Sequence, residues 1–480
     1  MRYLFIHQNF PAQYRHVVRY LADQPGNEVV FITQPNENVM PGVRKVTYPK
    51  DTRGPINCHA YAADIDRAIH TGATVADVCR GLYSSGFRPD LIVGHSGWGE
   101  TLFVKDVFPT VPLLANFEFY YHAAGVDVGF DAEFSSIFND PSRLRARNGV
   151  NLLAFQSADW GHSATQWQRG LNPPEMQSRI SVLHEGVDTG VACPKPGARF
   201  KIPLTGKVLT RRDEVITYVA RNLEPYRGFH IFMRSLPQLL RRRKHAHVVI
   251  VGGDGVSYGA PPPPRSTFRE MMLKELGAEL DLSRVHFLGM LDYRAYLTLL
   301  QVSSVHVYLT YPFVLSWSLI EALSCGCLVV GSATPPVLEV LSDEVNGLTV
   351  DFFGYRALAE RMEEALSADP ARMLALREGA RRTAVSGFDL GTVILPQWNG
   401  LFSDLIAGRQ PSGGEGSRQA SGGKGSRRAT GGISCPPAAF APRRLAGRGK
   451  RENSSETEEG TVALAARRVV GRGKRKMGRR

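Results

Sequence analysis

The chain has 480 residues, more than one hydrophobic core ordinarily organises, so at least two domains are expected. It carries 58 Lys and Arg against 45 Asp and Glu, a net charge of +13, but residues 409–480 hold 18 of the basic and only 5 of the acidic residues. The remainder is therefore neutral overall, which argues against a nucleic-acid-binding body and confines any general attraction to polyanions to the last segment.

The sequence also restricts where the protein works. No stretch is long and apolar enough to span a bilayer, and the first residues, MRYLFIHQNFPAQ, lack the cleavage site of a secretory signal. The six cysteines form no C-x-x-C pair, so neither a disulfide framework nor a zinc site is indicated. We expect a cytoplasmic protein whose only membrane association is peripheral, at the inner face.

In the first half of the chain, helical patterns such as 11–24 alternate with apolar runs. Near-continuous apolar runs are typical of parallel strands that are buried on both faces. The predicted strands are YLFIH (3–7), EVVFIT (28–33), DLIVG (90–94), PLLAN (112–116), LLAFQ (152–156) and ISVLH (180–184).

The second half repeats the alternation, with helices predicted at 229–243, 292–302 and 356–368. Its predicted strands are VITYVA (215–220), HVVIVG (247–252), VHFLG (285–289), VHVYLT (305–310), CLVVGS (327–332) and GLTV (347–350). Strand–helix alternation of this kind implies a doubly wound α/β architecture, and two sets of about six strands imply two such domains facing a cleft.

Changes in residue composition along the chain indicate where the domains begin and end. We predict domains at 1–195 and 205–390, separated by the Pro- and Gly-rich stretch CPKPGARFKIPLTGK, and a helix within 391–408 that packs back on the first domain. Residues 409–480 are rich in Gly, Ser and Arg and are predicted to be a disordered basic tail. Such a tail suits weak contact with a polyanion or an anionic membrane, or has no function of its own.

Two arginines, Arg221 and Arg227, flank the turn that follows VITYVA. Ligands of open α/β sheets bind beyond the carboxyl ends of the strands, and Arg227 directly precedes a predicted helix whose N-terminus favours anions. Two permanent positive charges at this place suit a diphosphate. The alternative is that both arginines are solvated or paired with carboxylates.

The next strand ends in a glycine-rich loop, VGGDGVSYG (251–259). Its glycines, Gly253 among them, allow the backbone to approach a ligand closely, although any tight turn uses glycine. A nicotinamide fingerprint would need a third glycine at Tyr258, and the first strand's loop has no glycine. An NAD-dependent oxidoreductase is therefore disfavoured.

The helix predicted after Thr310 carries one carboxylate, Glu321, among apolar residues. A carboxylate at a strand-end cleft can accept hydrogen bonds from two adjacent hydroxyls, such as those of a ribose. The spacing from Ser318 to Glu321 equally fits a capping box, so the two interpretations stay open.

These segments resemble the donor-binding domain of family-4 retaining glycosyltransferases (glycosyl transferases group 1), which have the two-Rossmann B-type fold. VARNLEPYRGF and LIEALSCGCLVVGS carry the resemblance, together with LHEGVDT (183–189) and VHFLGML (285–291). The resemblance covers about residues 1–405 and is strongest after 180. It implies that Arg221 and Arg227 bind the donor diphosphate, that Glu321 binds its ribose, and that Gly253 and Met290 lie beside the nucleobase.

The sequence departs from the family at one important place. The first glutamate of the family's E-x7-E motif, which contacts the transferred sugar, is replaced by Phe313, and the G-F-G that follows in the family is Val314-Leu315-Ser316 here, so both of its glycines are lost. The backbone of Val314 and Leu315 is still expected at the sugar. The departure leaves the nucleotide site intact and makes the identity of the sugar an open question.

Candidate acceptor-side residues follow strands of the first half. Glu118, after PLLAN, stands where many family members have a histidine and could position an acceptor hydroxyl or accept its proton; His95 ends another strand beside Trp98. Tyr120 and Tyr121 could stack on a sugar ring. The alternative is a structural role for each. Asp64-Ile-Asp66 has the metal-binding D-x-D form but lies in a helical pattern, so we interpret it as a solvated helix face.

The function that follows is transfer of a sugar from a nucleoside-diphosphate-sugar to a hydroxyl of a glycan, lipid-linked or small-molecule acceptor, in glycan or polysaccharide biosynthesis. The resemblance implies retention of configuration. The arginines would stabilise the leaving diphosphate without a metal or cofactor, and no specific nucleic acid is expected. The alternatives are a sugar-nucleotide epimerase on the same fold and a non-catalytic nucleotide-binding scaffold.

Overall fold

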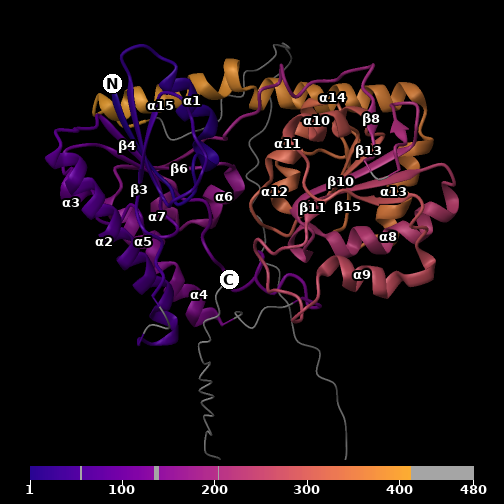
Figure 1. Ribbon diagram of the computed structural model, residues 1–480, viewed down its shortest axis with the longest axis horizontal. Coiled ribbons are helices and arrows are strands. Elements are labelled where there is room, and N and C mark those ends of the chain that lie inside the picture. Colours follow the sequence, from indigo (N-terminus) through magenta and orange to yellow (C-terminus); the bar gives the residue numbers. More distant parts are fainter. Residues whose placement is uncertain (54–56, 135–139, 204, 412–480) are drawn as a thin grey trace, which may run out of the picture. The chain divides into compact units, whose positions relative to one another are not determined.

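The computed structural model describes residues 1–53, 57–134, 140–203 and 205–411. The basic segment predicted to be disordered lies outside these residues, apart from its first three. The compact unit Met1–Ser417 contains two parallel sheets, each covered by helices (Figure 1). None of the described helices is long and apolar enough to cross a membrane.

The first lobe is a seven-stranded parallel sheet with helices α1–α7. Its strand order is β3-β2-β1-β4-β5-β6-β7. The strands are β1 (Arg2–Ile6), β2 (Glu28–Thr33), β3 (Val43–Thr47), β4 (Leu91–His95), β5 (Leu113–Asn116), β6 (Trp160–Ser163) and β7 (Ile180–Val182). The helices are α1 (Arg15–Ala22), α2 (Ala63–Ser84), α3 (Val104–Val107), α4 (Pro141–Arg147), α5 (Gly149–Ser157), α6 (Gln166–Leu171) and α7 (Pro174–Gln177).

The second lobe is a six-stranded parallel sheet of order β12-β11-β10-β13-β14-β15, with helices α8–α14. Its strands are β10 (Val215–Asn222), β11 (His247–Gly253), β12 (Val285–Phe287), β13 (Val305–Tyr308), β14 (Val329–Ser332) and β15 (Leu348–Val350). Its helices are α8 (Phe229–Arg242), α9 (Phe268–Leu276), α10 (Tyr293–Val302), α11 (Trp317–Ser324), α12 (Pro335–Leu338), α13 (Tyr355–Ser367) and α14 (Pro370–Phe388). The antiparallel pair β8 (Phe200–Lys201) and β9 (Val208–Leu209) precedes β10.

Continuous apolar sequence explains the two sheets. All four residues of β13 and of β14 are buried, as are five of the six in β2, because helices cover both faces of each sheet. Amphipathic helices complete the cores; α1, for example, buries Val17, Val18 and Leu21. The predicted doubly wound α/β fold with two Rossmann-like lobes is confirmed.

Three details of the first sheet differ from the prediction. The apolar run 152–156 lies in α5 rather than in a strand, with Leu152 and Leu153 about half exposed. The strands β3 and β6 were not predicted. VRKVT of β3 is a polar edge strand, and WGHS of β6 has no β-branched residue, so neither carries the apolar signal of a buried strand.

After α14 the chain returns to the first lobe. Val187 pairs with Asp389, and helix α15 (Leu395–Ile406) then packs Trp398 and Phe402 into the core of the first sheet. Figure 1 shows α15 beside α1 on the first lobe. Helix α14, which precedes α15 in the sequence, lies on the second lobe. The chain therefore joins the two lobes a second time, through a helix that is packed into the core of the first lobe.

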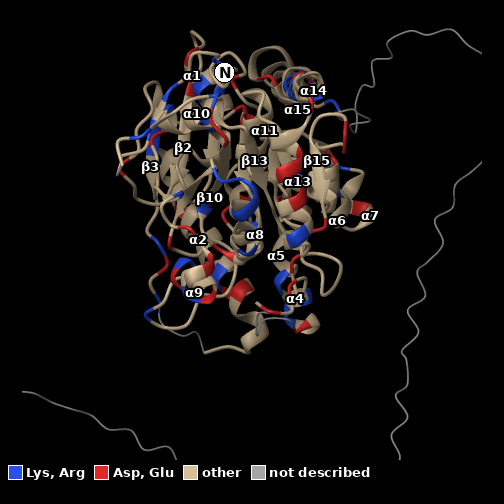
Figure 2. Cartoon of the chain, turned by 90° about the vertical axis from the view of Figure 1, so that its right-hand side faces the viewer, with Lys and Arg blue, Asp and Glu red and all other residues tan. Residues whose placement is uncertain are grey.

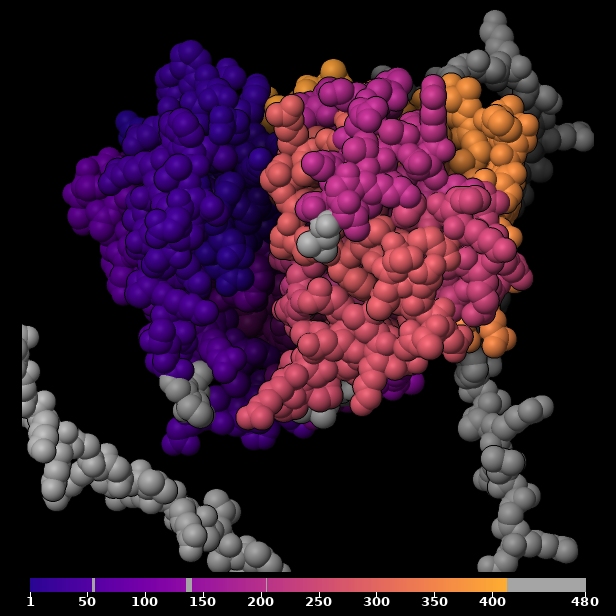
Figure 3. Space-filling model, turned by 45° about the vertical axis from the view of Figure 1, so that its right-hand side comes forward, coloured from indigo at the N-terminus to yellow at the C-terminus, as the bar shows by residue number. Residues whose placement is uncertain are grey.

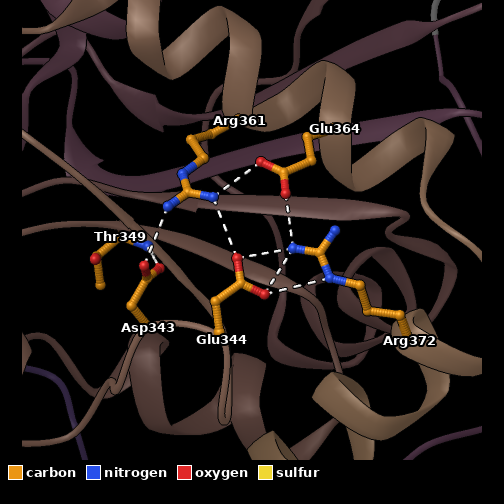
Figure 4. Close-up of polar contacts among 6 residues, drawn as sticks. All are labelled: Asp343, Glu344, Thr349, Arg361, Glu364 and Arg372. Carbon is orange, nitrogen blue, oxygen red and sulfur yellow. Dashed lines mark hydrogen bonds and ion pairs between the residues drawn. The ribbon is translucent and has the colours of Figure 1, made fainter.

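Charged residues of both signs are interspersed over α9 and α13 (Figure 2), as expected for a neutral body. One of the ion-pair networks joins the loop before β15 to α13 and α14 (Figure 4). Glu344, in the left-handed region at φ 60°, accepts from Arg361 and Arg372, and Glu364 bridges the same two arginines. The side chains are 28–44% exposed, so water and salt weaken the network.

We expect Glu344→Gln to lower Tm by about 1–3 °C at low salt, because both arginines lose one of their carboxylate partners. The loss should shrink in 1 M NaCl, where screening already weakens these pairs. Differential scanning calorimetry measures both values. Glu378→Gln on α14, whose pairing with Arg382 is a single 3.9 Å contact, is the control. A loss of Tm that salt does not change would contradict an electrostatic role.

Candidate active site

The carboxyl ends of the strands of both lobes open on one cavity of about 450 Å³. Trp98 and Glu118, which follow β4 and β5 in the first lobe, line it opposite Tyr226, Tyr258 and Phe313, which follow β10, β11 and β13 in the second. Figure 3 shows the groove between the indigo first lobe and the salmon second lobe. Each sheet therefore presents its strand-end loops to a shared space, where open α/β sheets bind ligands.

Arg227 is buried at the second-lobe side of this space, with 7% of its surface exposed. Its Nη1 donates to Thr310 Oγ1 and to the carbonyl of Val314, both at 2.9 Å, and its guanidinium lies 5.1 Å from the centre of the Tyr258 ring. Burial opposes the charged form, but the nearby oxygens of Tyr308, Tyr258 and Glu224 outweigh it and raise the pKa of Arg227. The positive charge is therefore permanent and fixed in place.

Arg221 stands at the end of β10 and is exposed. Within the described residues no ion pair of Arg221 is found, so of the two alternatives to a ligand contact the solvated one fits this side chain. Arg227 lies just before Gly228, whose φ of +67° begins α8, as predicted from the sequence. Both positive charges act on Glu118 of the first lobe, which places the two arginines and this carboxylate in one electrostatic neighbourhood.

Glu118 and His95 form a pair at the first-lobe side. His95 Nε2 lies 3.2 Å from Glu118 Oε2, and the Gly97 amide donates to His95 Nδ1 at 3.0 Å, so the Nε2 proton is the one directed at the carboxylate. The Trp98 ring stacks on His95 at 4.1 Å. Burial would raise the pKa of Glu118, but the His95 hydrogen bond and the charges of Arg221 and Arg227 prevail and lower it.

Glu321 accepts hydrogen bonds from two tyrosines of α10, Tyr293 at 2.9 Å and Tyr296 at 2.8 Å. It does not cap its helix, because α11 begins after Ser316, whose hydroxyl accepts from the amide of Ser318. The capping-box interpretation is therefore wrong. Burial raises the pKa of Glu321, although both tyrosine hydrogen bonds act in the opposite direction.

The segment that replaces the family's glutamate and glycines has an aromatic environment. The Phe313 ring lies 4.8 Å from Phe119 of the first lobe, 4.9 Å from Tyr258 and 5.4 Å from Tyr226. The carbonyl of the next residue, Val314, binds Arg227, and Leu315 is buried. The substitution thus extends an apolar wall across the two lobes beside the buried guanidinium.

Gly253, the last residue of β11, and Met290, in the loop after β12, lie outside the lining of this cavity. The Gly252 amide donates to the Gly289 carbonyl at 3.0 Å, which joins the end of β11 to that loop. Met290 is 67% exposed. A Cβ at residue 253 would come within 2.8 Å of Asn222 Oδ1, so a larger residue there would require the Asn222 side chain to move.

Comparisons with known proteins agree with this geometry. Residues 25–192 match the model of the glycosyl transferase family 4 group, and residues 205–383 match that of the glycosyl transferases group 1. The chain belongs to these glycosyltransferases. A comparison with curated proteins gives no match.

Solved structures share the fold of this glycosyltransferase at low sequence identity. The HepE protein of Anabaena in complex with UDP is 16% identical, with 84% of this chain and 100% of that chain covered and a TM-score of 0.59. The sucrose-phosphate synthase of Thermosynechococcus elongatus is 20% identical, with 85% and 100% covered and a TM-score of 0.61. A glycosyltransferase of Rickettsia africae is 12% identical, with 84% and 98% covered and a TM-score of 0.59.

The glycosyltransferase places Tyr258 over Arg227 by means of Glu224, which the sequence analysis did not single out. Glu224 is 1% exposed, and its carboxylate accepts from the backbone amides of Ser257, Tyr258 and Gly259 at 3.1–3.4 Å. The sequence offered one signal for Glu224, namely an acidic residue between Arg221 and Arg227. Its role depends on a loop more than 30 residues away, which sequence alone does not bring near.

Glu185, in the LHEGVDT segment, is a second residue that the sequence analysis did not single out. It follows β7, is about one-sixth exposed, and its Oε2 lies 3.7 Å from His184 Nε2. Burial, together with the nearby charge of Glu118, raises the pKa of Glu185 to about 7. The first lobe therefore contributes two carboxyl groups whose pKa values are shifted in opposite directions: that of Glu118 is lowered and that of Glu185 is raised.

The remaining candidates divide between the cavity and the core. Tyr121 lines the cavity, whereas Tyr120 packs against the core of the first lobe. Asp64 and Asp66 lie in the first turn of α2, as the helical pattern predicted; Asp66 is a partly exposed surface residue, but Asp64 also lines the cavity. The described residues contain no group of three or more side chains suited to a metal ion.

We expect Glu224→Gln to lower the free energy of unfolding by about 1–2 kcal/mol, because three partly buried amides lose a charged acceptor. Loosening of the 257–259 loop should also increase cleavage there by a protease of broad specificity. Urea denaturation and limited proteolysis measure the two effects. Glu279→Gln, at a 70% exposed side chain, is the control. Wild-type stability and wild-type cleavage in Glu224→Gln would show that this carboxylate does not hold the loop.

Proposed function

We propose that this glycosyltransferase moves a sugar from a nucleoside-diphosphate-sugar to an acceptor hydroxyl with retention of configuration and without a metal ion. The observation that carries the proposal is the placement of a buried cation, Arg227, and an exposed one, Arg221, across the cleft from Glu118, whose pKa their charges lower. One lobe thus offers an anion site and the other a proton acceptor. Transfer of a glycosyl group needs both at one place.

For the donor, the diphosphate would bind Arg221, Arg227 and the N-terminus of α8. The ribose would bind Glu321, whose oxygens Tyr293 and Tyr296 already orient. The nucleobase would lie at the joined loops of Gly253 and Met290, and the sugar would lie at the backbone of Val314 and Leu315. HepE has been solved with UDP and with UDP-glucose, so UDP-sugars are the first donors to test.

During transfer the bond between the anomeric carbon and the diphosphate breaks, and its electron pair leaves with the diphosphate. Arg221 and Arg227 would stabilise the growing negative charge, which removes the need for a metal ion. The acceptor oxygen attacks from the side of the leaving group, which gives retention. Glu118, ionised and oriented by His95, would position the acceptor hydroxyl and take its proton.

The acceptor would be a glycan, a lipid-linked or a small-molecule hydroxyl, and the reaction would serve glycan or polysaccharide biosynthesis in the cytoplasm or at the inner face of the membrane. A non-catalytic nucleotide-binding function is the second candidate. Phe313 favours it, because an aromatic ring stands where the family has a carboxylate. Binding of nucleotide without turnover of any donor would support the second candidate.

We expect Arg221→Gln to weaken UDP binding by about 10- to 100-fold, because a charge-assisted contact to the diphosphate is lost. Isothermal titration calorimetry with UDP measures the change. Arg212→Gln, an exposed arginine before β10 and remote from the cavity lining, is the matched control and should bind normally. Equal affinities in Arg221→Gln and wild type would remove Arg221 from the donor site.

We expect Glu118→Gln to lower kcat by about 100-fold or more while UDP binding changes little, since the amide cannot accept the proton. Release of nucleoside diphosphate under saturating donor measures kcat, and calorimetry with UDP measures binding. Glu133→Gln, at a carboxylate outside this cavity that pairs with Arg234, is the control. A fall in Tm with unchanged kcat would make Glu118 a structural residue.

The pH dependence of kcat follows from the pairing of Glu118 with His95. Because the pKa of Glu118 is lowered, its basic form persists through neutral pH and is lost only as the pH falls below the ordinary range of a glutamate. His95→Asn removes the 3.2 Å hydrogen bond, lets this pKa rise, and should move the acid limb of the kcat profile to higher pH. A profile in His95→Asn with the wild-type acid limb would contradict the assignment of that limb to Glu118.

A further inference from the structure

The second lobe has another hollow, of about 640 Å³, at the opposite ends of its strands from the cleft. Glu214, His247 and His286, which line it, stand at the beginnings of β10, β11 and β12. The lining residues differ from those of the cavity between the lobes. Strand β11 runs for seven residues from His247 to Gly253, so about 20 Å of strand separates this hollow from the cleft.

Two buried imidazoles line this hollow. His247 is 9% and His286 is 8% exposed, and their rings stack with centres 5.5 Å apart. Burial is the main cause that lowers the pKa of both rings, and the charge of Lys207 lowers it further, to about 4 for His247. At neutral pH each ring is therefore uncharged and carries a single N–H.

Lys207 determines which nitrogen of each ring carries the proton. Its ammonium contacts His247 Nε2 and can only donate, so this nitrogen is the acceptor. The proton of His247 is then on Nδ1, which lies 3.2 Å from His286 Nε2 and donates to it. The proton of His286 is consequently on its own Nδ1, and within the described residues nothing accepts from that N–H. The chain of hydrogen bonds ends in a donor without a partner, on a ring that lines the hollow.

Three basic side chains surround these rings. Lys207, Lys244 and Arg212 line the hollow and are exposed. In the part of the chain that the structure describes, none of the three forms an ion pair with a carboxylate. Their charges are therefore available to a ligand.

Two carboxylates near the hollow are paired with arginines of their own. Glu214 forms an ion pair with Arg243. Asp281 lies 2.7 Å from Arg284, whose side chain also lines the hollow. These pairs leave the balance of charge in the hollow unchanged.

Asp213 is the carboxylate that opposes the basic side chains. It accepts from the amide and the hydroxyl of Thr210, both at 2.8 Å. Its charge also acts on Lys207 and His247. One carboxylate stands against three cations, so the hollow keeps an excess of positive charge.

We propose that this hollow binds a phosphate group, as inorganic phosphate or as a phosphate monoester, through Lys207, Lys244 and the Nδ1–H of His286. The oxygens of a phosphate are acceptors only, so one ion can accept from both ammonium groups and from the imidazole at once. A metal ion fits less well, because the described residues contain no group of three or more side chains suited to one. The site lies outside the proposed donor site and does not depend on the proposed function.

The test measures how fast Lys207 and Lys244 react, because a phosphate bound between them shields both amines. The full chain is acetylated with an N-hydroxysuccinimide ester at constant ionic strength, and peptide mass spectrometry gives the rate at each lysine. At about 10 times its dissociation constant a ligand leaves about one site in ten empty, so inorganic phosphate should slow both rates about 10-fold. Lys274 on α9, an exposed lysine outside this lining, should react at an unchanged rate.

Glucose 6-phosphate and glucose are the further ligands of the test. Protection by inorganic phosphate alone assigns the hollow to the free anion. Equal or stronger protection by glucose 6-phosphate assigns it to a monoester. Glucose, which has no phosphate, should not protect either lysine.

Variants locate the protection. His247→Leu/His286→Leu removes the donor chain and replaces both partners by apolar side chains, a change that costs little stability, so protection should be lost while Tm stays near that of wild type. Lys244→Gln changes only an exposed side chain, and phosphate should then protect Lys207 about 5-fold less well. Lys274→Gln is the matched control. Protection should also persist in Arg221→Gln, which separates this hollow from the donor site.

Three results would overturn the inference. The first is an unchanged rate at Lys207 and Lys244 with both inorganic phosphate and glucose 6-phosphate. The second is protection that survives in both His247→Leu/His286→Leu and Lys244→Gln, or that is as strong at Lys274. The third is protection by Zn²⁺ but not by phosphate, which would assign the two imidazoles to a metal ion.

Discussion

The burial of one guanidinium organises the strand-end loops of the second lobe. Arg227 needs acceptors because a buried charge without partners is costly, and it finds them in Thr310 and in the carbonyl of Val314. The contact with Val314 sets the course of the segment between β13 and α11. The contact with the Tyr258 ring requires the loop after β11 to fold inward, and Glu224 holds that loop there. Loops of three strands are thus fixed by one charge.

The same loops also hold the two lobes together. Tyr226 and Tyr311 donate across the cleft to Asp127 and Asp131. Phe313 packs on Phe119 of the opposite lobe. These contacts come from the same loops that surround Arg227, so a change in the distance between the lobes would reach Arg227. Closure of such a cleft excludes water, which favours transfer over hydrolysis.

The sequence predicted the second lobe better than the first, for a physical reason. All six strands of the second sheet are apolar runs that helices bury on both faces, and this produces a plain pattern. In the first sheet, β3 is a polar edge strand and β6 is short, while the apolar run at 152–156 belongs to a helix. Burial there depends on neighbours that are distant in the chain.

The candidate site, too, contains residues that the sequence could indicate and contacts that it could not. Arg221, Glu118 and His95 could be proposed from the sequence because each stands within two residues of a strand end, where a parallel sheet presents its ligand-binding residues, and Arg227 could be proposed because it directly precedes α8. Contacts between segments that are distant in sequence gave no signal. The tyrosines that hold Glu321, the loop that Glu224 anchors and the approach of α4 to the cavity all depend on the packing of the folded chain.

The most direct test of the central claim is the thermal stability of the full chain with UDP, GDP, ADP or NAD. At about 100 times its dissociation constant, a nucleoside diphosphate that binds only the native state should stabilise it by about 2.7 kcal/mol. We expect the Tm of the full chain to rise with one nucleoside diphosphate and not to change with NAD. A rise with NAD alone, or with none of the four, would contradict the claim that the two lobes form a nucleotide-sugar site.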